Sequence, residues 1–138
     1  MDSISKRLIG DSIKLDRKIA ALLASLDAFA HTVREARADL DAVSRELHSL
    51  QAVLGLLGEE APLLPADIAV QGPALLEHCS GAVDQLDEYV STLDRLGLSR
   101  LEKRTHWLGT GRLETASFAS TLEAHRVTIG LSLDLAQA

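Results

Sequence analysis

The sequence predicts an all-α protein, built as an antiparallel four-helix bundle with a short extra connecting helix. Apolar residues recur at alternating intervals of three and four over most of the chain, which is the spacing of a helical seam. Aromatic residues make up only 3 % of the chain and the three prolines all lie between Pro62 and Pro73, so helices are favoured over strands. With 138 residues, 46 % of them hydrophobic, residues 1–138 are enough for one domain with its own core.

The first half of the chain carries the longest apolar seam. Its members are Leu15, Ile19, Leu22, Leu26, Phe29, Val33, Ala36, Leu40, Val43, Leu47, Leu50, Leu54 and Leu57, and Ile4 and Leu8 extend it backwards. Ser25 and Asp27 can cap a helix N-terminus, so we expect a break there, with helices over residues 3–24 and 27–57. The alternative is one long helix over residues 1–57, which would present the seam to a second chain as a coiled coil.

A loop and a third helix follow. The segment from Gly58 to Pro65 holds a helix-terminating glycine and two prolines, which is typical of a loop. Pro73 suits the first turn of a helix, and the same apolar spacing continues beyond it through Cys79. We therefore expect the third helix over residues 73–96.

Two shorter signals mark the end of the bundle. Ser99 followed by Glu102 matches a capping box, which predicts a short helix over residues 99–108. Gly109 and Gly111 then indicate a turn, and the last helix is expected over residues 112–135. Its predicted buried residues are Phe118, Leu122, Ile129 and Leu133.

Charge and cysteine content restrict the class of protein. The formal net charge is −6, which argues against nucleic-acid binding because a phosphate backbone is held mainly by clustered Lys and Arg. Cys79 is the only cysteine, so no disulfide can form within the chain. No apolar run reaches the length of a transmembrane helix. These features favour a cytoplasmic protein.

No catalytic, cofactor or metal site is predicted, and we do not expect an enzyme. No two of the five histidines stand three or four residues apart, so a metal site would need the tertiary fold to bring its ligands together. Cys79 and His78 are neighbours that a helix would turn about 100° apart, which does not make a nucleophile–base pair. The sequence Gly109-Thr110-Gly111 lacks the Lys-Ser/Thr ending of a phosphate-binding loop.

Two basic segments are candidate surfaces for an anionic membrane or a partner. One consists of Arg95, Arg100, Lys103, Arg104, Trp107 and Arg112, in which a tryptophan accompanies basic side chains. The other consists of Lys6, Arg7, Lys14, Arg17 and Lys18, on a helix with one apolar face. The structural alternative is that the tryptophan plugs the end of the bundle, that its basic neighbours neutralise acidic residues, and that the first helix is an ordinary bundle helix.

The segment from Phe29 to Leu54, FAHTVREARADLDAVSRELHSLQAVL, resembles the fungal N-terminal domain called HeLo-like. The resemblance continues through a Pro-containing loop, a helix with a Cys near its start, a short basic stretch with Trp, and a last helix reading LEAHR from Leu122 to Arg126. It covers most of the chain from Ile19 onward, but its motifs are structural and identify no catalytic residue.

This resemblance implies a signalling module of fungal programmed cell death, heterokaryon incompatibility or NLR-type receptors. Such a module would act by self-association and contact with anionic membrane, with recruitment to the plasma membrane. The first helix departs from the family's small and apolar pattern because it carries many charged residues. Each charge at a bilayer centre costs about 3 kcal/mol, so interfacial binding is favoured over insertion. The alternative is a non-membrane interaction or dimerisation module that precedes downstream receptor domains.

Overall fold

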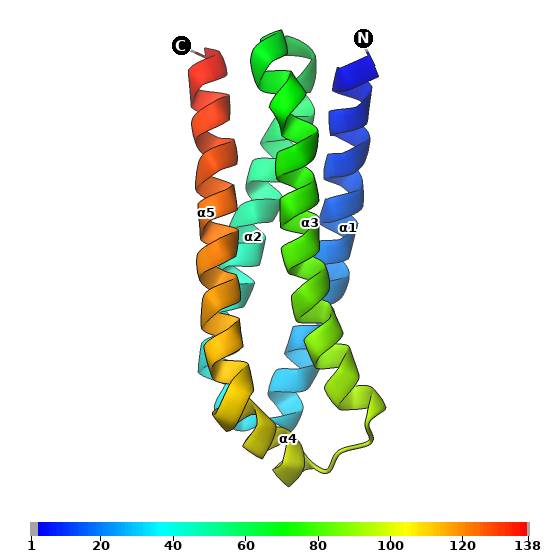
Figure 1. Cartoon of the computed structure of the whole chain (residues 1–138), viewed down its shortest axis with the longest axis vertical. Coiled ribbons are helices and arrows are strands. Elements are labelled where there is room, and N and C mark those ends of the chain that lie inside the picture. Colours follow the sequence, from blue (N-terminus) through cyan, green and yellow to red (C-terminus); the bar gives the residue numbers. More distant parts are fainter. Residues whose placement is uncertain (1–2, 138) are drawn as a thin grey trace.

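A computed structural model describes residues 3–137, and every regular element in that range is helical (Figure 1). The elements are α1 (Ser3–Thr32), a 3₁₀ turn (Arg34–Ala36), α2 (Arg37–Glu60), a second 3₁₀ turn (Ala61–Leu63), α3 (Ala66–Arg95), α4 (Arg100–His106), a π turn (Trp107–Gly111) and α5 (Arg112–Gln137). The prediction of an all-α bundle of four main helices and one short connecting helix is confirmed.

The predicted break at Ser25 and Asp27 is wrong, and so is the alternative of one unbroken helix. Helix α1 continues to Thr32, and α2 begins at Arg37 instead of residue 27. The Ser25 hydroxyl donates to the Ala21 carbonyl one turn earlier, at 3.2 Å, as Ser often does inside a helix. The chain leaves α1 at Val33, whose backbone is extended, with φ −118° and ψ 95°. A prediction based on polar cap residues alone therefore placed the chain reversal too early in the sequence.

All thirteen seam residues predicted from Leu15 to Leu57 are buried, although the chain reverses direction in the middle of the seam. Val33 and Ala36 lie in the turn itself and stay in the core. The extension to Leu8 is also buried, whereas Ile4 is 36 % exposed. Ser5 lies inward in its place, and its hydroxyl donates to the Ala61 carbonyl at 3.1 Å.

The third helix begins earlier than predicted. Helix α3 starts at Ala66, directly after Pro65, and Pro73 lies inside it instead of opening it. Helix α2 likewise passes through Gly58 and ends at Glu60, so the predicted loop is shorter than Gly58 to Pro65. Proline fits the first turn of a helix but does not require one, and here a different proline, Pro65, is the N-cap residue that precedes the helix.

The predicted capping box at α4 is confirmed, because Ser99 Oγ accepts from the Glu102 amide and the Glu102 side chain accepts from the Ser99 amide, both at 3.2 Å. Helix α4 covers Arg100–His106 and not residues 99–108. The predicted turn at Gly109 and Gly111 is wrong, since the backbone stays helical there as a π turn that leads directly into α5. The last helix consequently extends from Arg112 to Gln137, beyond the predicted residues 112–135.

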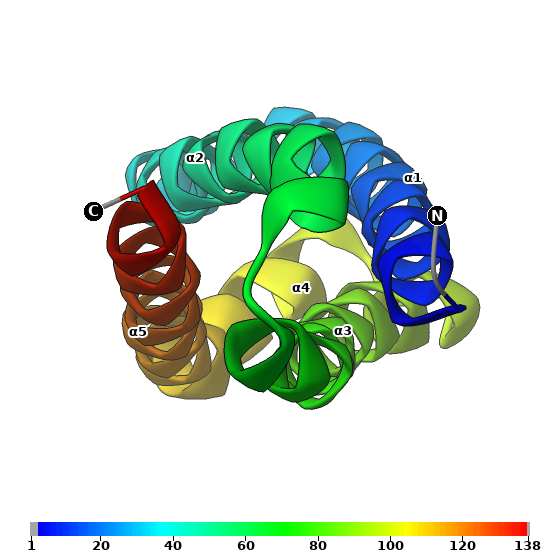
Figure 2. The ribbon, with the colours of Figure 1, turned by 90° about the horizontal axis from the view of Figure 1, so that it is seen from above.

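Consecutive long helices run in opposite directions, but they do not simply circle the bundle (Figures 1 and 2). Figure 2 shows the connection between α2 and α3 crossing the end of the bundle. Helix α1 packs against α2 and α3, and α5 packs against α2 and α3. As a result α1 and α3 are neighbours that run in the same direction, while α3 and α5 are antiparallel neighbours. These two helix pairs carry the surfaces described below.

Candidate interaction surfaces

Trp107 is part of the core at the end of the bundle and not an exposed membrane contact. Its side chain is 0 % exposed and its ring packs against Phe29 and Tyr89, with ring centroids 5.5 and 6.3 Å away. The indole Nε1 donates to Asp39 Oδ2 at 3.0 Å, which satisfies the one polar group of the ring. From this position Trp107 cannot reach a lipid surface, and that part of the predicted membrane patch is wrong.

The basic residues around Trp107 mostly form ion pairs with acidic neighbours. Arg95 pairs with Glu88, Lys103 with Asp94, Arg104 with Glu35 and Arg112 with Asp39, at 2.9, 2.9, 2.7 and 3.1 Å. Arg100 is exposed and forms no ion pair within residues 3–137. The charge of the segment from Arg95 to Arg112 is thus largely neutralised, as the structural alternative expected.

The basic residues of α1 lie away from that end, and four of them, Arg7, Lys14, Arg17 and Lys18, lie along the edge that α1 shares with α3. Lys18 Nζ lies 2.8 Å from Asp84 Oδ1 and also donates to the Ser80 hydroxyl at 2.7 Å. Arg7 pairs with Asp11 within α1 at 3.6 Å. Lys6, Lys14 and Arg17 are exposed and pair with no acidic residue in the described part of the chain. The two predicted basic segments therefore do not form one patch.

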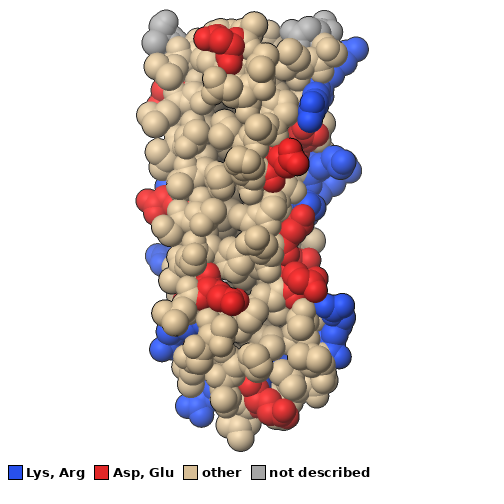
Figure 3. Space-filling view, viewed as in Figure 1, with Lys and Arg blue, Asp and Glu red and all other residues tan. Residues whose placement is uncertain are grey.

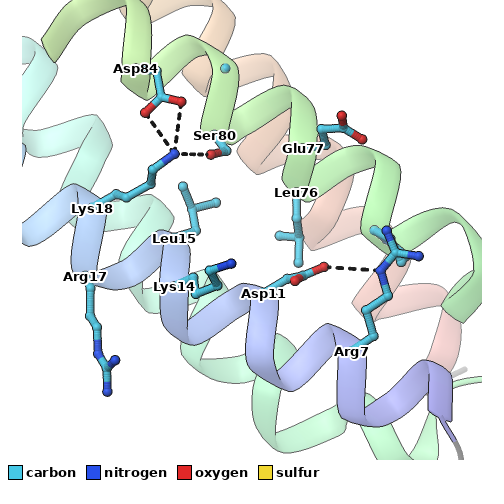
Figure 4. A pocket seen from close by; sticks show the side chains of 12 residues that line it. Arg7, Asp11, Lys14, Leu15, Arg17, Lys18, Leu76, Glu77, Ser80 and Asp84 are labelled. Atoms are coloured by element: carbon cyan, nitrogen blue, oxygen red, sulfur yellow. Dashed lines mark hydrogen bonds and ion pairs between the residues drawn. The ribbon is translucent and has the colours of Figure 1, made fainter. Parts of the chain in front are cut away.

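A groove of about 650 Å³ separates α1 from α3 (Figure 4). Leu15 and Leu76 contribute apolar lining between the two helices. Its charged lining is mainly basic on the α1 side, with Arg7, Lys14, Arg17 and Lys18 beside the one acid Asp11, and acidic on the α3 side, with Glu77 and Asp84. Figure 4 shows Lys18 reaching across to Asp84, while Arg17 points away from the groove.

The contrast in charge extends beyond the groove. Between Ser3 and Lys18, α1 carries five basic side chains against two acidic ones, whereas α3 carries six acidic side chains and Arg95. In Figure 3 basic side chains follow the upper right edge of the molecule, over α1, and acidic side chains lie beside them over α3. We call this two-signed surface the α1–α3 face.

The outer side of α5 forms a different kind of surface. Val127, Leu131 and Leu135 recur every four residues and are all exposed. No charged residue interrupts the sequence from Val127 to Leu133. Periodicity had pointed only to the inner side of this helix, where Leu122, Ile129 and Leu133 are buried as predicted and Phe118 is partly buried.

Cys79 and His78 point to different surroundings, as helical geometry predicts for neighbours. Cys79 is fully buried in the core, and burial raises the pKa of its thiol to about 11. The thiol is therefore protonated at neutral pH and is a core residue rather than a nucleophile. His78 instead lies beside His125 of α5, a contact that sequence spacing could not predict.

Within residues 3–137, no group of three or more His, Cys, Asp or Glu side chains is arranged to hold a metal ion. In the same range, no helix combines the length and the apolar character needed to cross a bilayer. Comparisons with protein-family models, with curated proteins and with solved structures gave no match. The resemblance to the HeLo-like domain stays a prediction.

Proposed function

We propose that this chain is a non-catalytic signalling module that acts by self-association through the α1–α3 face. The observation that carries the proposal is the placement of a basic helix edge beside an acidic one on two neighbouring helices that run in the same direction. A surface that presents both signs side by side can be complementary to a second copy of itself.

Symmetry determines how two copies would meet. A twofold axis parallel to the bundle places α1 of each copy against α3 of the other, so opposite charges meet at two equivalent places. A twofold axis across the face would place α1 against α1 and α3 against α3, which like charges disfavour. The charge pattern therefore selects a parallel dimer.

The ion pair between Lys18 and Asp84 shows which residues of α1 and α3 lie at the same height along the bundle axis. A twofold axis parallel to the bundle keeps these heights, so it also fixes which residues meet in the dimer. Lys14 and Arg17 lie within one turn of Lys18, and Glu77 lies two turns before Asp84 on the same side of α3. In the parallel dimer, Lys14 and Arg17 of one copy would face Glu77 and Asp84 of the other.

The size of the face fits a dimer interface. A helix of 30 residues such as α1 or α3 is about 45 Å long, and packed helices lie about 8–10 Å apart. A patch of that length and about two helices wide is on the order of 800 Å² per copy, the usual area of a specific interface. Because the face is mainly charged, we expect a reversible dimer that weakens as salt increases.

Self-association is also what the HeLo-like resemblance implies, and in a signalling module it would be the step that transmits the signal. Assembly of such modules would bring together whatever receptor domains or partners are attached to them. It does not depend on the segment from Arg95 to Arg112, whose charges are mostly paired.

Charge reversal tests the proposal. Lys14→Glu with Arg17→Glu, or Glu77→Lys with Asp84→Lys, should weaken the dimer at least about tenfold, because each change turns attraction into repulsion at two equivalent places. The measurement is sedimentation equilibrium over a range of protein concentrations, at low and at moderate salt. Loss of the ion pair between Lys18 and Asp84 should leave the fold intact, since its side chains are 43 % and 59 % exposed and such pairs contribute about 0–1 kcal/mol.

Two further variants locate the interface. Arg37→Glu with Arg45→Glu changes the net charge by the same amount as Lys14→Glu with Arg17→Glu, but at exposed positions of α2. It should leave association unchanged. Leu131→Glu tests the apolar outer side of α5. A wild-type chain that is monomeric at high concentration would contradict the proposal, and so would a dimer that only Leu131→Glu disrupts.

A second candidate function is contact between α1 and an anionic membrane. The observation that favours it is that Lys6, Lys14 and Arg17 are exposed without an acidic partner among residues 3–137. The apolar side of α1 is buried in the core, so the contact would be electrostatic, between these exposed cations and anionic lipid headgroups. The dimer would cover Lys14 and Arg17, so membrane binding and self-association would compete.

Vesicle co-sedimentation at two lipid compositions tests this second candidate. Replacing Lys6, Lys14 and Arg17 by Gln should weaken binding to phosphatidylserine-containing vesicles by about 1 kcal/mol per cation and leave neutral vesicles unbound. Arg100→Gln with Arg104→Gln is the control at the other end of the bundle and should have little effect. Equal losses for both variants, or no binding by the wild type, would exclude a specific role of α1.

A further inference from the structure

Two histidines that are distant in the sequence lie together between α3 and α5. The imidazole of His78 on α3 and that of His125 on α5 have centroids 6.1 Å apart, and their planes are inclined by 53°. They belong to antiparallel neighbouring helices, so the contact is created by the fold and not by spacing within one helix. The tertiary fold thus brings two histidine side chains together, as a histidine metal site in this chain would require.

The separation of the two rings suits a shared metal ion. Zinc binds imidazole nitrogen at about 2.0–2.1 Å, and two rings on one ion have centroids about 5–6.5 Å apart, depending on the angle at the metal. We propose that His78 and His125 form a cross-helix site for a divalent late transition metal ion, with Zn²⁺ as the expected occupant.

The chemical state of the two rings supports this assignment. In the described part of the chain, neither imidazole takes part in a hydrogen bond or an ion pair, so their nitrogens are available as ligands. The neutral imidazole is the form that binds metal.

The site rests on rigid elements. His125 is partly buried and stands between Leu122 and Ile129, both of which are buried in the core. His78 is exposed, but it directly precedes Cys79, whose burial fixes this turn of α3. A metal ion bound by both rings would connect α3 to α5 and stabilise the folded state by mass action.

His78 and His125 are the two ligands that the chain supplies at this place. Within residues 3–137, no third His, Cys, Asp or Glu side chain joins them in a group that could hold a metal ion. The remaining coordination positions would be filled by water or by a ligand from another molecule. The site is therefore an open one, unlike the four-ligand sites that hold structural zinc.

Calorimetric titration of the full chain with ZnCl₂ tests the proposal, using protein without an affinity tag. We expect one ion per chain and an increase in the thermal midpoint with added Zn²⁺. Loss of even an outer-shell partner typically weakens a metal site about 10- to 100-fold, so His78→Gln or His125→Gln should weaken binding at least that much. Circular dichroism verifies that each variant is folded.

His48→Gln is the matched control, because His48 is an exposed histidine on α2. It should leave both the affinity and the stoichiometry unchanged. Imidazole NMR signals provide a second measurement, and those of His78 and His125 should shift together on addition of Zn²⁺. No binding, binding that survives both glutamine variants, or a shift confined to one of the two rings would overturn the proposal.

Discussion

Trp107→Ala is expected to lower the free energy of unfolding by about 3–5 kcal/mol, the usual cost of removing a fully buried aromatic side chain. The ring is 0 % exposed and fills the end of the bundle between Phe29 and Tyr89. Its removal would also leave Asp39 without the indole donor at 3.0 Å. Urea unfolding followed by circular dichroism measures the loss.

A graded set of variants separates the two contributions of Trp107. Trp107→Phe keeps most of the apolar volume and should cost clearly less than Trp107→Ala. Asp39→Asn keeps an acceptor for the indole and should cost less still, although it weakens the ion pair with Arg112. A Trp107→Ala variant as stable as the wild type would show that the ring is not part of the core.

Gly111→Ala is expected to cost about 1–3 kcal/mol, because it overpacks the same region. A Cβ at this position would lie 2.5 Å from Tyr89 Oη and 2.6 Å from Trp107 Cε3, which is too close for unbonded atoms. The Trp107 ring is 0 % exposed and the Tyr89 hydroxyl is buried, so neither can move away freely. Urea unfolding, with the slope of the transition as a check on two-state behaviour, gives the value.

Gly109→Ala is the matched control, since Gly109 lies two residues earlier in the same π turn. A Cβ there meets no atom within 4 Å, so the change should be neutral or slightly stabilising. Equal losses for the two variants would show that the π turn itself requires glycine, rather than the space beside Trp107.

The apolar spacing of the sequence was sufficient to predict the core of the long helices. The seam from Leu15 to Leu57 is buried in full, because a helix turns the same residues inward whether or not the chain reverses between them. For that reason the seam could not locate the reversal. Val33 and Ala36 keep the period within the turn, and the reversal carries neither glycine nor proline.

The candidate sites were harder to predict because they depend on which helices are neighbours. Nothing in the spacing shows that α2 and α3 lie across the bundle from one another, which makes α1 a neighbour of α3. The opposite charges of Lys14 and Glu77 are brought together by that arrangement. The contact between His78 and His125 depends on which sides of α3 and α5 face each other. Trp107 beside basic residues was ambiguous, and its burial beside Asp39 is a tertiary fact.

A mixing experiment tests the central claim, self-association through the α1–α3 face, most directly. The variant Lys14→Glu/Arg17→Glu has two acidic helix edges, and the variant Glu77→Lys/Asp84→Lys has two basic ones. Neither should associate with itself, but an equimolar mixture places opposite charges at both contacts of the twofold dimer. Sedimentation equilibrium should therefore find heterodimers in the mixture and monomers in each separate sample. A mixture that remains monomeric while the wild type dimerises would contradict the α1–α3 face as the interface.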